Sequence, residues 1–267
     1  MRISCIQYTA EPDLAISEGR LYPLMDKAAT ARADVILLPE CALCLSSNQA
    51  ISRAQALTIE APEVHRLRHY AADHAVTLIV GSLIMATAQG VKNRTLVINP
   101  QGVIQATYDK IHLFDVDLAS GESYRESSLF DAGSKPTMTP IQDWTVGLSI
   151  CFDLRFPALY RHYGVAGADL VVVPAAFTKT TGQAHWATLL RARAIENGCF
   201  IVAAAQCGRT TEGRETYGHS VVYDPWGDCL GELSDEPGVL TVDLILDRVQ
   251  AVRSSVPVMT QHRDFKA

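Results

Sequence analysis

The sequence has no apolar run long enough to cross a membrane. A transmembrane helix needs ~20 consecutive apolar residues, and the longest candidate, residues 76–91, is interrupted by Thr, Ser, Gly and Gln. The opening stretch MRISCIQYTAEPD reaches Glu11 and Asp13 too soon to contain the apolar core of a signal peptide. We therefore expect a cytoplasmic protein with no membrane partner.

Lysine and arginine are too few and too scattered to form a nucleic-acid-binding surface. The 267-residue chain has 23 Lys and Arg against 29 Asp and Glu, a net charge of −6, and the two signs are interspersed. A protein that follows a phosphate backbone needs a basic patch or stripe. We expect a small-molecule partner and no nucleic acid.

A disulfide framework is also missing. The seven cysteines are an odd number without repeating spacing, and a chain of this length can bury a core without covalent cross-links, so we expect reduced thiols. Cys41 and Cys44 form a single C-x-x-C with no second pair and no histidine at ligand spacing, so we expect no metal and no cofactor. A thiol-redox role for this pair stays open as a distant alternative.

Several familiar catalytic motifs are absent. The sequence contains no G-x-S-x-G, no H-E-x-x-H and no G-x-x-x-x-G-K-[ST], which argues against the hydrolase nucleophile elbow, the zinc-protease helix and the P-loop. The eight histidines show no metal-ligand spacing. A Cys–His dyad remains open, because His112, His185 or His219 could approach a reactive cysteine in the fold.

Short apolar runs alternate with helical patterns along the whole chain. There is no internal repeat, low-complexity tract or flexible linker, which favours a single domain over residues 1–267. Six runs are typical of strands: RISCIQY, DVILLP, VTLIVGSLI, WTVGLSI, DLVVVP and CFIVAAA. The continuous apolar run DVILLP is typical of a strand buried on both faces. Helices are predicted at 17–33, 61–75, 155–166 and 184–198, and hairpins around NPQG and DPWG at 94–110 and 218–233.

This order of elements predicts an α/β fold with mixed sheets. Strands that alternate with helices favour parallel pairing, and the two hairpins add antiparallel pairs. The two halves of the chain have similar layouts, so we expect two sheets packed face to face with helices outside.

Three reactive side chains follow predicted strands: Glu40 after DVILLP, Lys110 after VIQATYD and Cys151 after WTVGLSI. Residues at the C-terminal ends of strands in layered α/β folds gather around one crevice. A carboxylate whose pKa is raised by desolvation could take the thiol proton, and an ammonium with the backbone N–H of Phe152 could bind an oxyanion. Singly, each residue also has an ordinary explanation as a cap, a solvated charge or a small buried side chain.

Together, these segments resemble the nitrilase superfamily of carbon–nitrogen hydrolases. VILLPE is similar to its glutamate motif, YDKIHLFDVD to its lysine motif and CFDLRFP to its cysteine motif, and the likeness runs from ISCIQY to VRSSVPVMTQHR. The resemblance implies a four-layer α-β-β-α sandwich with two mixed sheets. It also implies a homodimer or higher homo-oligomer.

The resemblance gives each motif residue an expected role. Glu40 would be the general base and then the acid for the leaving amine, Lys110 would help to hold the oxyanion, and Cys151 would form a thioester that water hydrolyses. The superfamily often has a second glutamate after the lysine. In SGESYRESSLF the R-E-S pattern assigns this positioning role to Glu126, and Glu122 is expected to be solvated.

Two further segments concern the substrate. PAAFTKTTGQAHWATLLRARAIENGCFIVAAAQCGR and YGHSVVYDPWG are most similar to the Nit branch, which implies hydrolysis of the amide of a 2-oxoglutaryl compound. Within that branch, the resemblance carried by the AAAQCG run implies cysteinylglycine as the leaving amine and deaminated glutathione as the substrate. Ammonia released from 2-oxoglutaramate, or hydrolysis of a carbamoyl amide, remains the alternative. An inactive amidase-like binding protein is a distant one, disfavoured by the presence of all three motif residues.

Overall fold

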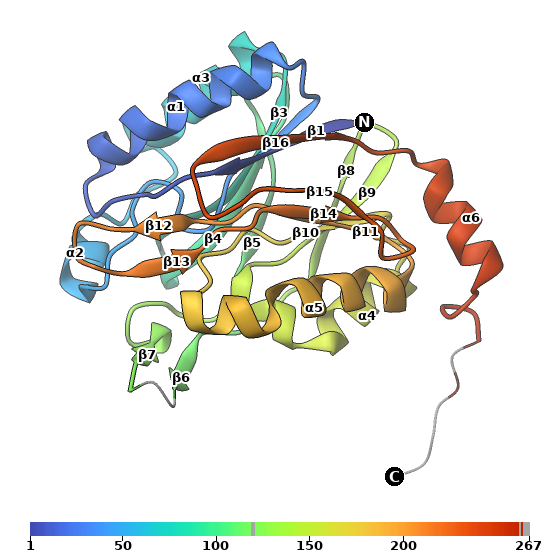
Figure 1. Cartoon of the computed structure of the whole chain (residues 1–267). Helices are drawn as coiled ribbons and strands as arrows, with labels where there is room; N and C mark the ends of the chain where they lie inside the picture. Colours follow the sequence, from blue (N-terminus) through green and yellow to red (C-terminus); the bar gives the residue numbers. More distant parts are fainter. Residues whose placement is uncertain (119–120, 262, 264–267) are drawn as a thin grey trace.

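Two six-stranded sheets packed face to face form the centre of the protein (Figure 1). The computed structural model describes residues 1–118, 121–261 and 263. In order across the first sheet lie β16 (Gly238–Asp243), β1 (Arg2–Gln7), β2 (Val35–Leu37), β3 (Thr77–Thr87), β4 (Gly90–Ile98) and β5 (Ile104–Asp109). The β1–β2–β3 pairs are parallel and the other pairs antiparallel, so the sheet is mixed.

The second sheet has the same mixed character. Across it lie β15 (Cys229–Glu232), β14 (Val221–Tyr223), β11 (Phe200–Ala203), β10 (Leu170–Val172), β9 (Trp144–Leu148) and β8 (Thr137–Ile141). β9, β10 and β11 are parallel, and all residues of β10 and β11 are buried. Strands covered on both faces are continuous apolar runs, which explains DLVVVP and CFIVAAA.

Two helices cover the outer face of the first sheet (Figure 1). α1 (Leu14–Thr30) begins after Asp13, whose side chain accepts a hydrogen bond from the Ile16 amide, and α3 (Pro62–Asp73) has proline in its first turn. The buried residues of α1 recur at helical spacing, namely Ser17, Leu21, Met25 and Ala28. This apolar stripe attaches the helix to the sheet.

α4 (Pro157–Val165) and α5 (Lys179–Asn197) cover the second sheet. α5 begins at Lys179, five positions before the predicted start at 184, because Thr178 caps it by accepting a hydrogen bond from the Thr181 amide. Gly198 ends it in the left-handed conformation at φ 55°. A Cβ at Gly182 would collide with the Tyr217 ring, so glycine is needed in this early turn for the helix to pack.

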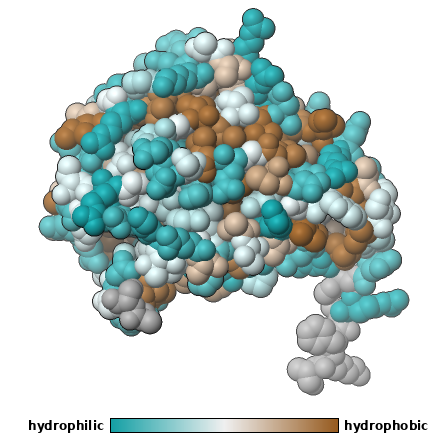
Figure 2. Space-filling view, viewed as in Figure 1, coloured by the Kyte–Doolittle hydropathy of each residue, from teal (hydrophilic) through white to brown (hydrophobic). Residues whose placement is uncertain are grey.

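Two large apolar clusters hold the layers together. One joins the facing sides of both sheets and continues under α4 and α5; the other lies between the first sheet and its two helices. Smaller apolar patches also reach the surface (Figure 2). Four of the exposed apolar side chains lie on α5, around β15 and after β16. Ile195 is on α5, Trp226 is in the turn before β15, Leu230 is in β15, and Ile245 follows β16. No helix in the described ranges is long and apolar enough to span a membrane.

The predicted α-β-β-α sandwich with two mixed sheets is confirmed. The structure adds several elements without strong sequence patterns: β6 (Asp115–Asp117), β7 (Ser123–Arg125), β12 (Cys207–Arg209), β13 (Glu215–Tyr217), α2 (Gln49–Ala54) and α6 (Asp247–Ser255). β8 and β16 also lay outside the predicted strands. Most of these elements are short or partly exposed, so little hydrophobic periodicity marks them.

Candidate active site

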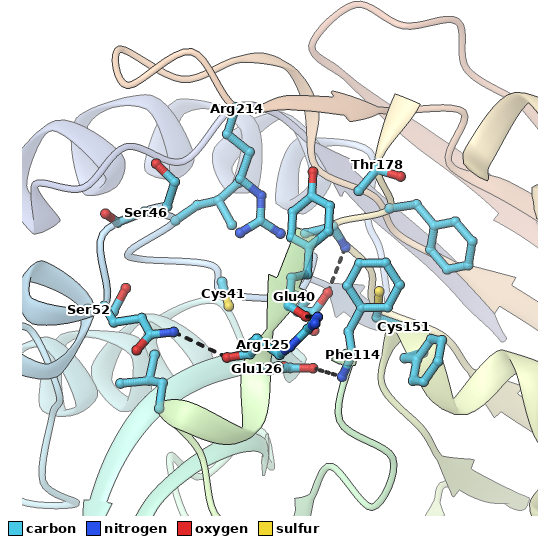
Figure 3. A pocket seen from close by; sticks show the side chains of 18 of the residues that line it. Glu40, Cys41, Ser46, Ser52, Phe114, Arg125, Glu126, Cys151, Thr178 and Arg214 are labelled. Atoms are coloured by element: carbon cyan, nitrogen blue, oxygen red, sulfur yellow. Dashed lines mark hydrogen bonds between the residues drawn. The ribbon is translucent and has the colours of Figure 1, made fainter. Parts of the chain in front are cut away.

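A cavity of about 560 Å³ opens beside the ends of β2, β5, β9 and β10. Glu40, Lys110, Glu126 and Cys151 all line it, and Figure 3 shows Glu40, Glu126 and Cys151 around its floor. The structure thus brings the four predicted side chains together from four separate segments of the chain. The volume of the cavity lies within the range of small-molecule sites, roughly 300–1,000 Å³.

Cys151 lies on a sharp turn that follows β9. Its backbone is left-handed, with φ 48°, which costs roughly 1–2 kcal/mol for a residue with a Cβ. Its amide donates to the Pro174 carbonyl at 2.8 Å, and the 3-10 turn η2 (Cys151–Arg155) starts immediately. This turn presents the thiol to the cavity at 8% exposure. The Phe152 N–H lies at the start of η2, where backbone donors lack an intrahelical acceptor.

A buried carboxylate behind this turn holds it in place. Asp153, fully buried, accepts hydrogen bonds from the Ile150 amide at 2.9 Å, the Tyr108 hydroxyl at 2.7 Å and the His112 amide at 3.0 Å. Nδ1 of His112 is also 2.7 Å from it. Asp153 was not among the predicted site residues, because a single Asp after a cysteine carries no pattern of its own.

Glu40 is fixed from both its main chain and its side chain. Its Oε2 accepts from the Ala176 amide at 2.8 Å, and its carbonyl accepts from Gln206 Nε2 at 3.0 Å. The next residue, Cys41, is left-handed at φ 54°, and its amide donates to Ser82 Oγ at 2.8 Å. The carboxylate is therefore held at the end of β2 with 4% of the residue exposed.

Lys110 joins two carboxylates. Its Nζ lies 2.7 Å from Oε1 of Glu40 and 2.9 and 2.8 Å from the two carboxylate oxygens of Glu126. The Phe114 amide donates to Glu126 Oε2 at 2.6 Å, so Glu126 is itself held from behind. Glu126 begins the short turn η1 (Glu126–Ser128).

Asn93 of β4 is a fifth member of this cluster. Its Nδ2 donates to Oε1 of Glu40 and to Oε1 of Glu126, both at 3.0 Å. Sequence reasoning missed Asn93, which lies in a strand and is only 2% exposed. The sequence offered only a weak signal for Asn93, namely that a polar residue occupies a position that a central strand would bury.

The ammonium of Lys110 determines the charge state of its neighbours. Burial alone would raise the pKa of Glu40, but the charge and hydrogen bond of Lys110 bring it below its ordinary value. The expectation that desolvation raises this pKa is therefore wrong. Burial alone would lower the pKa of Lys110, and the two carboxylates raise it well above the usual value. Glu40 is a carboxylate and Lys110 an ammonium at neutral pH.

The pKa of Cys151 is raised well above the usual value, first by burial and then by the negative charge of Glu40. The resting nucleophile is therefore a thiol rather than a thiolate. It needs a base that accepts its proton during attack, and Glu40 is the carboxylate that lines the same cavity and whose charge acts on the thiol.

The three candidate histidines have other partners. His112 contacts Asp153 and stacks on Phe156, His185 accepts from Arg155, and His219 contacts Glu232. Within the described residues none of them is hydrogen-bonded to Cys151, so the geometry gives no support to a Cys–His dyad.

The remaining candidates lie at the cavity edge. Glu122 is exposed and accepts a hydrogen bond from the Tyr124 hydroxyl. Cys41 and Cys44 line the cavity as free, buried thiols. Burial raises the pKa of both, that of Cys44 to about 12. A redox-active thiol needs a lowered pKa, so this environment disfavours a redox role for the pair.

A thiol, a carboxylate base and a fixed ammonium in one cavity can carry out acyl transfer. Comparison with known proteins agrees with this chemistry. The family model described as carbon-nitrogen hydrolase matches residues 2–254. A deaminated glutathione amidase from Synechocystis sp. is 38% identical over 98% of this chain and 97% of its own length.

Two solved structures share the fold. The NitFhit protein of C. elegans superposes with a TM-score of 0.91 at 34% identity, over 98% of this chain and 65% of that longer chain. An amidase from Nesterenkonia sp. AN1 superposes with a TM-score of 0.79 at 30% identity, over 96% of this chain and 98% of that one. It was solved with the result of a Michael addition of acrylamide at its active-site cysteine.

Proposed function

As this chain belongs to the carbon–nitrogen hydrolase family of the nitrilase superfamily, we propose that it is an amidase acting on 2-oxoglutaryl amides through a thioester on Cys151. The observation that carries the chemistry is the convergence of Cys151, Glu40 and Lys110 on one buried cavity. Among 2-oxoglutaryl amides, deaminated glutathione is the proposed substrate. Its products are 2-oxoglutarate and cysteinylglycine.

In the acylation step, Glu40 takes the proton of the Cys151 thiol as sulfur attacks the amide carbon. The resulting oxyanion lies within reach of Lys110 Nζ and of the Phe152 N–H, which stabilise its charge. Glu40 then gives the proton to the leaving nitrogen, and the carbon–nitrogen bond breaks. The acyl group remains on Cys151 as a thioester.

In the deacylation step, water takes the place of the departed amine. Glu40, again ionised, accepts a proton from the water as it attacks the thioester carbon. The second oxyanion uses the same two donors, and its collapse returns the proton to Cys151. Glu126 and Asn93 keep the Lys110 ammonium and the Glu40 carboxylate in place during both steps.

The size of the cavity supports a substrate with an extended leaving group. At about 560 Å³ it continues past Glu40 to Ser46, to Thr178 and to the 209–215 segment. A tripeptide-sized molecule reaches ~10 Å when extended, whereas 2-oxoglutaramate has only ammonia beyond the scissile bond. The name of the Synechocystis relative, deaminated glutathione amidase, points to the same substrate.

The test is release of 2-oxoglutarate from deaminated glutathione and from 2-oxoglutaramate, compared by kcat/KM. A higher value for deaminated glutathione supports the proposal. A higher value for 2-oxoglutaramate would make the enzyme an omega-amidase instead. If the enzyme hydrolyses neither compound, the proposed 2-oxoglutaryl specificity is refuted, and carbamoyl and other small amides become the substrates to test.

We propose further that the enzyme is a cytoplasmic homo-oligomer. The exposed side chains of Trp226 and Ile245, with exposures of 53% and 67%, are large apolar groups that association could cover. Seven free thiols suit a reducing compartment. Sedimentation of the purified protein tests whether it is a homo-oligomer.

A further inference from the structure

Arg214 projects into the cavity from the tip of the β12–β13 hairpin. Its backbone is fixed there, because its amide donates to Thr210 Oγ1 at 3.2 Å and its carbonyl accepts from the Thr210 amide at 2.9 Å. Figure 3 shows the guanidinium pointing from the hairpin toward Cys41 and Glu40. The guanidinium carbon lies 5.9 Å from the Tyr124 ring centroid, so the side chain is supported on an aromatic wall.

Within the described ranges, no carboxylate lies within 4.0 Å of the Arg214 guanidinium, and its buried Nε has no hydrogen-bond partner. Two other arginines at the cavity are paired with carboxylates, Arg209 with Glu215 and Arg125 with Asp117. A buried donor without an acceptor is unfavourable and calls for an explanation. An anionic ligand group in the cavity would supply the acceptor.

Arg155 is a second cation without a carboxylate partner among the described residues. Its guanidinium lies over the rings of Phe152 and Phe177, at 5.9 and 5.4 Å from their centroids. Burial lowers its pKa. Cys151 and Arg155 are the first and last residues of the turn η2 and both line the cavity, so Arg155 lies on the same side as the nucleophile.

A row of aromatic rings connects the two arginines. Tyr124 contacts Phe114 at 5.1 Å between centroids, and Phe114 contacts Phe152 at 5.0 Å. Arg214 lies at the Tyr124 end of this row and Arg155 at the Phe152 end. Among the described residues, the cavity thus has a guanidinium without a carboxylate partner near each end of an apolar wall, which suits a molecule with an anionic group at each end.

The position of Glu40 indicates which end receives the leaving amine. The Arg214 guanidinium points from the β12–β13 hairpin toward Glu40 (Figure 3), and its charge helps to lower the pKa of this carboxylate, after the larger effects of burial, Lys110 and Cys151. Glu40 is the proposed proton donor to the leaving nitrogen. The part of the substrate beyond that nitrogen therefore lies toward Arg214, and the acyl part lies toward Arg155.

We propose that Arg214 binds a carboxylate at the far end of the leaving amine and so selects amides whose leaving group is itself an acid. This inference rests on the proposed function and specifies its leaving group. Cysteinylglycine ends in such a carboxylate and ammonia has none. A guanidinium–carboxylate pair forms strong, directional hydrogen bonds, so this contact distinguishes the two substrates.

The test uses three substrates and two variants. The substrates are deaminated glutathione, the same molecule with its terminal carboxylate converted to a carboxamide, and 2-oxoglutaramate. The variants are Arg214→Gln and the control Arg2→Gln, which removes an arginine that is 41% exposed, already paired with Asp243 and not among the residues that line the cavity. For each enzyme, kcat and KM are measured with 2-oxoglutarate release as the readout.

We expect the wild-type enzyme to prefer the free acid over the carboxamide roughly 10- to 100-fold in kcat/KM. Arg214→Gln removes most of this preference, mainly by raising KM for the acid, and Arg2→Gln keeps it. The ratio of deaminated glutathione to 2-oxoglutaramate turnover falls by a similar factor in Arg214→Gln only. Because the readout is a ratio within one variant, a fraction of misfolded protein does not imitate it.

Two results would overturn the role of Arg214 and leave the proposed function intact. One is an Arg214→Gln enzyme that keeps the preference for the acid. The other is an Arg214→Gln enzyme whose kcat/KM falls by the same factor for deaminated glutathione and for 2-oxoglutaramate, which would place Arg214 on the acyl side. Turnover of none of the three substrates by the wild type would instead refute the proposed function itself, and this inference with it.

Discussion

Lys110 Nζ lies 2.7 Å from Glu40 Oε1, and the two side chains are only 2% and 5% exposed. Glu126 brings a second carboxylate to the same ammonium at 2.8 Å. Two buried carboxylates around one cation are stable only while that cation is present, because each charge has lost most of its hydration. The fold and the proposed chemistry therefore depend on the same contact.

Replacing Lys110 by Met should lower the free energy of unfolding by about 3–5 kcal/mol, since it leaves two buried carboxylates facing each other. The pKa of Glu40 should then rise, because the largest effect that opposes burial is lost. Urea unfolding measures the first effect, and amidase activity should be lost. The control is Lys92→Met, since Lys92 is also buried but donates only to carbonyls of Asp131 and Ala132. Equal destabilisation by the two variants would contradict the importance of the ion pairs.

Glu40 should make stability fall at acid pH. Its folded-state pKa lies below the ordinary 4.5, so its contribution is present above that value and is lost as the pH falls through the folded-state pKa. Unfolding free energies of the wild type and Glu40→Gln, measured between about pH 3 and pH 7, test this. The wild type should lose more stability on acidification. Parallel curves would show that Glu40 has no lowered pKa.

Cys151→Ala should abolish the thioester and lower kcat at least ~10³-fold. Alanine has a Cβ, as cysteine does, so the left-handed backbone is no worse and the protein should stay folded. Mass spectrometry of the intact, acid-quenched protein during turnover should show an acyl adduct on the wild type only. Cys199→Ala is the matched control, as Cys199 is fully buried elsewhere and unrelated to the cavity. An active Cys151→Ala enzyme would end the proposed mechanism.

Asn93 variants should separate hydrogen bonding from charge. Asn93→Ala removes two donors from the carboxylates of Glu40 and Glu126, and we expect kcat to fall about 10-fold. Asn93→Asp adds a third negative charge to the buried cluster and should be more harmful in both activity and melting temperature. If Asn93→Asp had an activity and a melting temperature equal to or higher than those of Asn93→Ala, the electrostatic account of the cluster would be wrong.

Asp153 and Tyr108 offer a matched pair for the turn that carries Cys151. Asp153→Asn places an amide NH₂ where backbone donors need an acceptor, whereas Tyr108→Phe removes a single hydroxyl from the same network. We expect a loss of about 2–3 kcal/mol of unfolding free energy for the first and about 1 kcal/mol for the second. Denaturant titration and kcat are the measurements. Comparable effects would mean that the carboxylate does not organise the turn.

The sequence located the four principal residues because each belongs to a recognisable motif. Glu40, Lys110 and Cys151 follow apolar strands, and Glu126 lies in an R-E-S pattern. Asn93 could not be found in this way, since its partners come from distant segments and only the folded sheet brings it beside them. For the same reason the direction of the Glu40 pKa was missed: burial could be foreseen, but the 2.7 Å contact with Lys110 could not.

The fold was predictable where strands were buried on both faces and less so where tertiary contacts override local preference. The start of α5 contains Thr180, Thr181 and Gly182, which disfavour helix. It is helical because Thr178 caps it and because the Tyr217 ring packs against Gly182. β12 and β13 pair for only three residues each, too short for an alternating pattern. The Arg214 position at their tip was therefore not visible in the sequence.

The grouping of two carboxylates, one ammonium and one thiol has a consequence for every turnover. Before reaction the group carries one net negative charge, since Lys110 balances one of the two carboxylates. Moving the proton from Cys151 to Glu40 relocates this charge to sulfur, and attack relocates it to the substrate oxygen, but its sum is constant. Creating new charge in a buried site of low polarity is what makes such steps slow. Here the free-energy cost of burying this negative charge is met when the chain folds. During catalysis the same charge only moves between Glu40, Cys151 and the substrate.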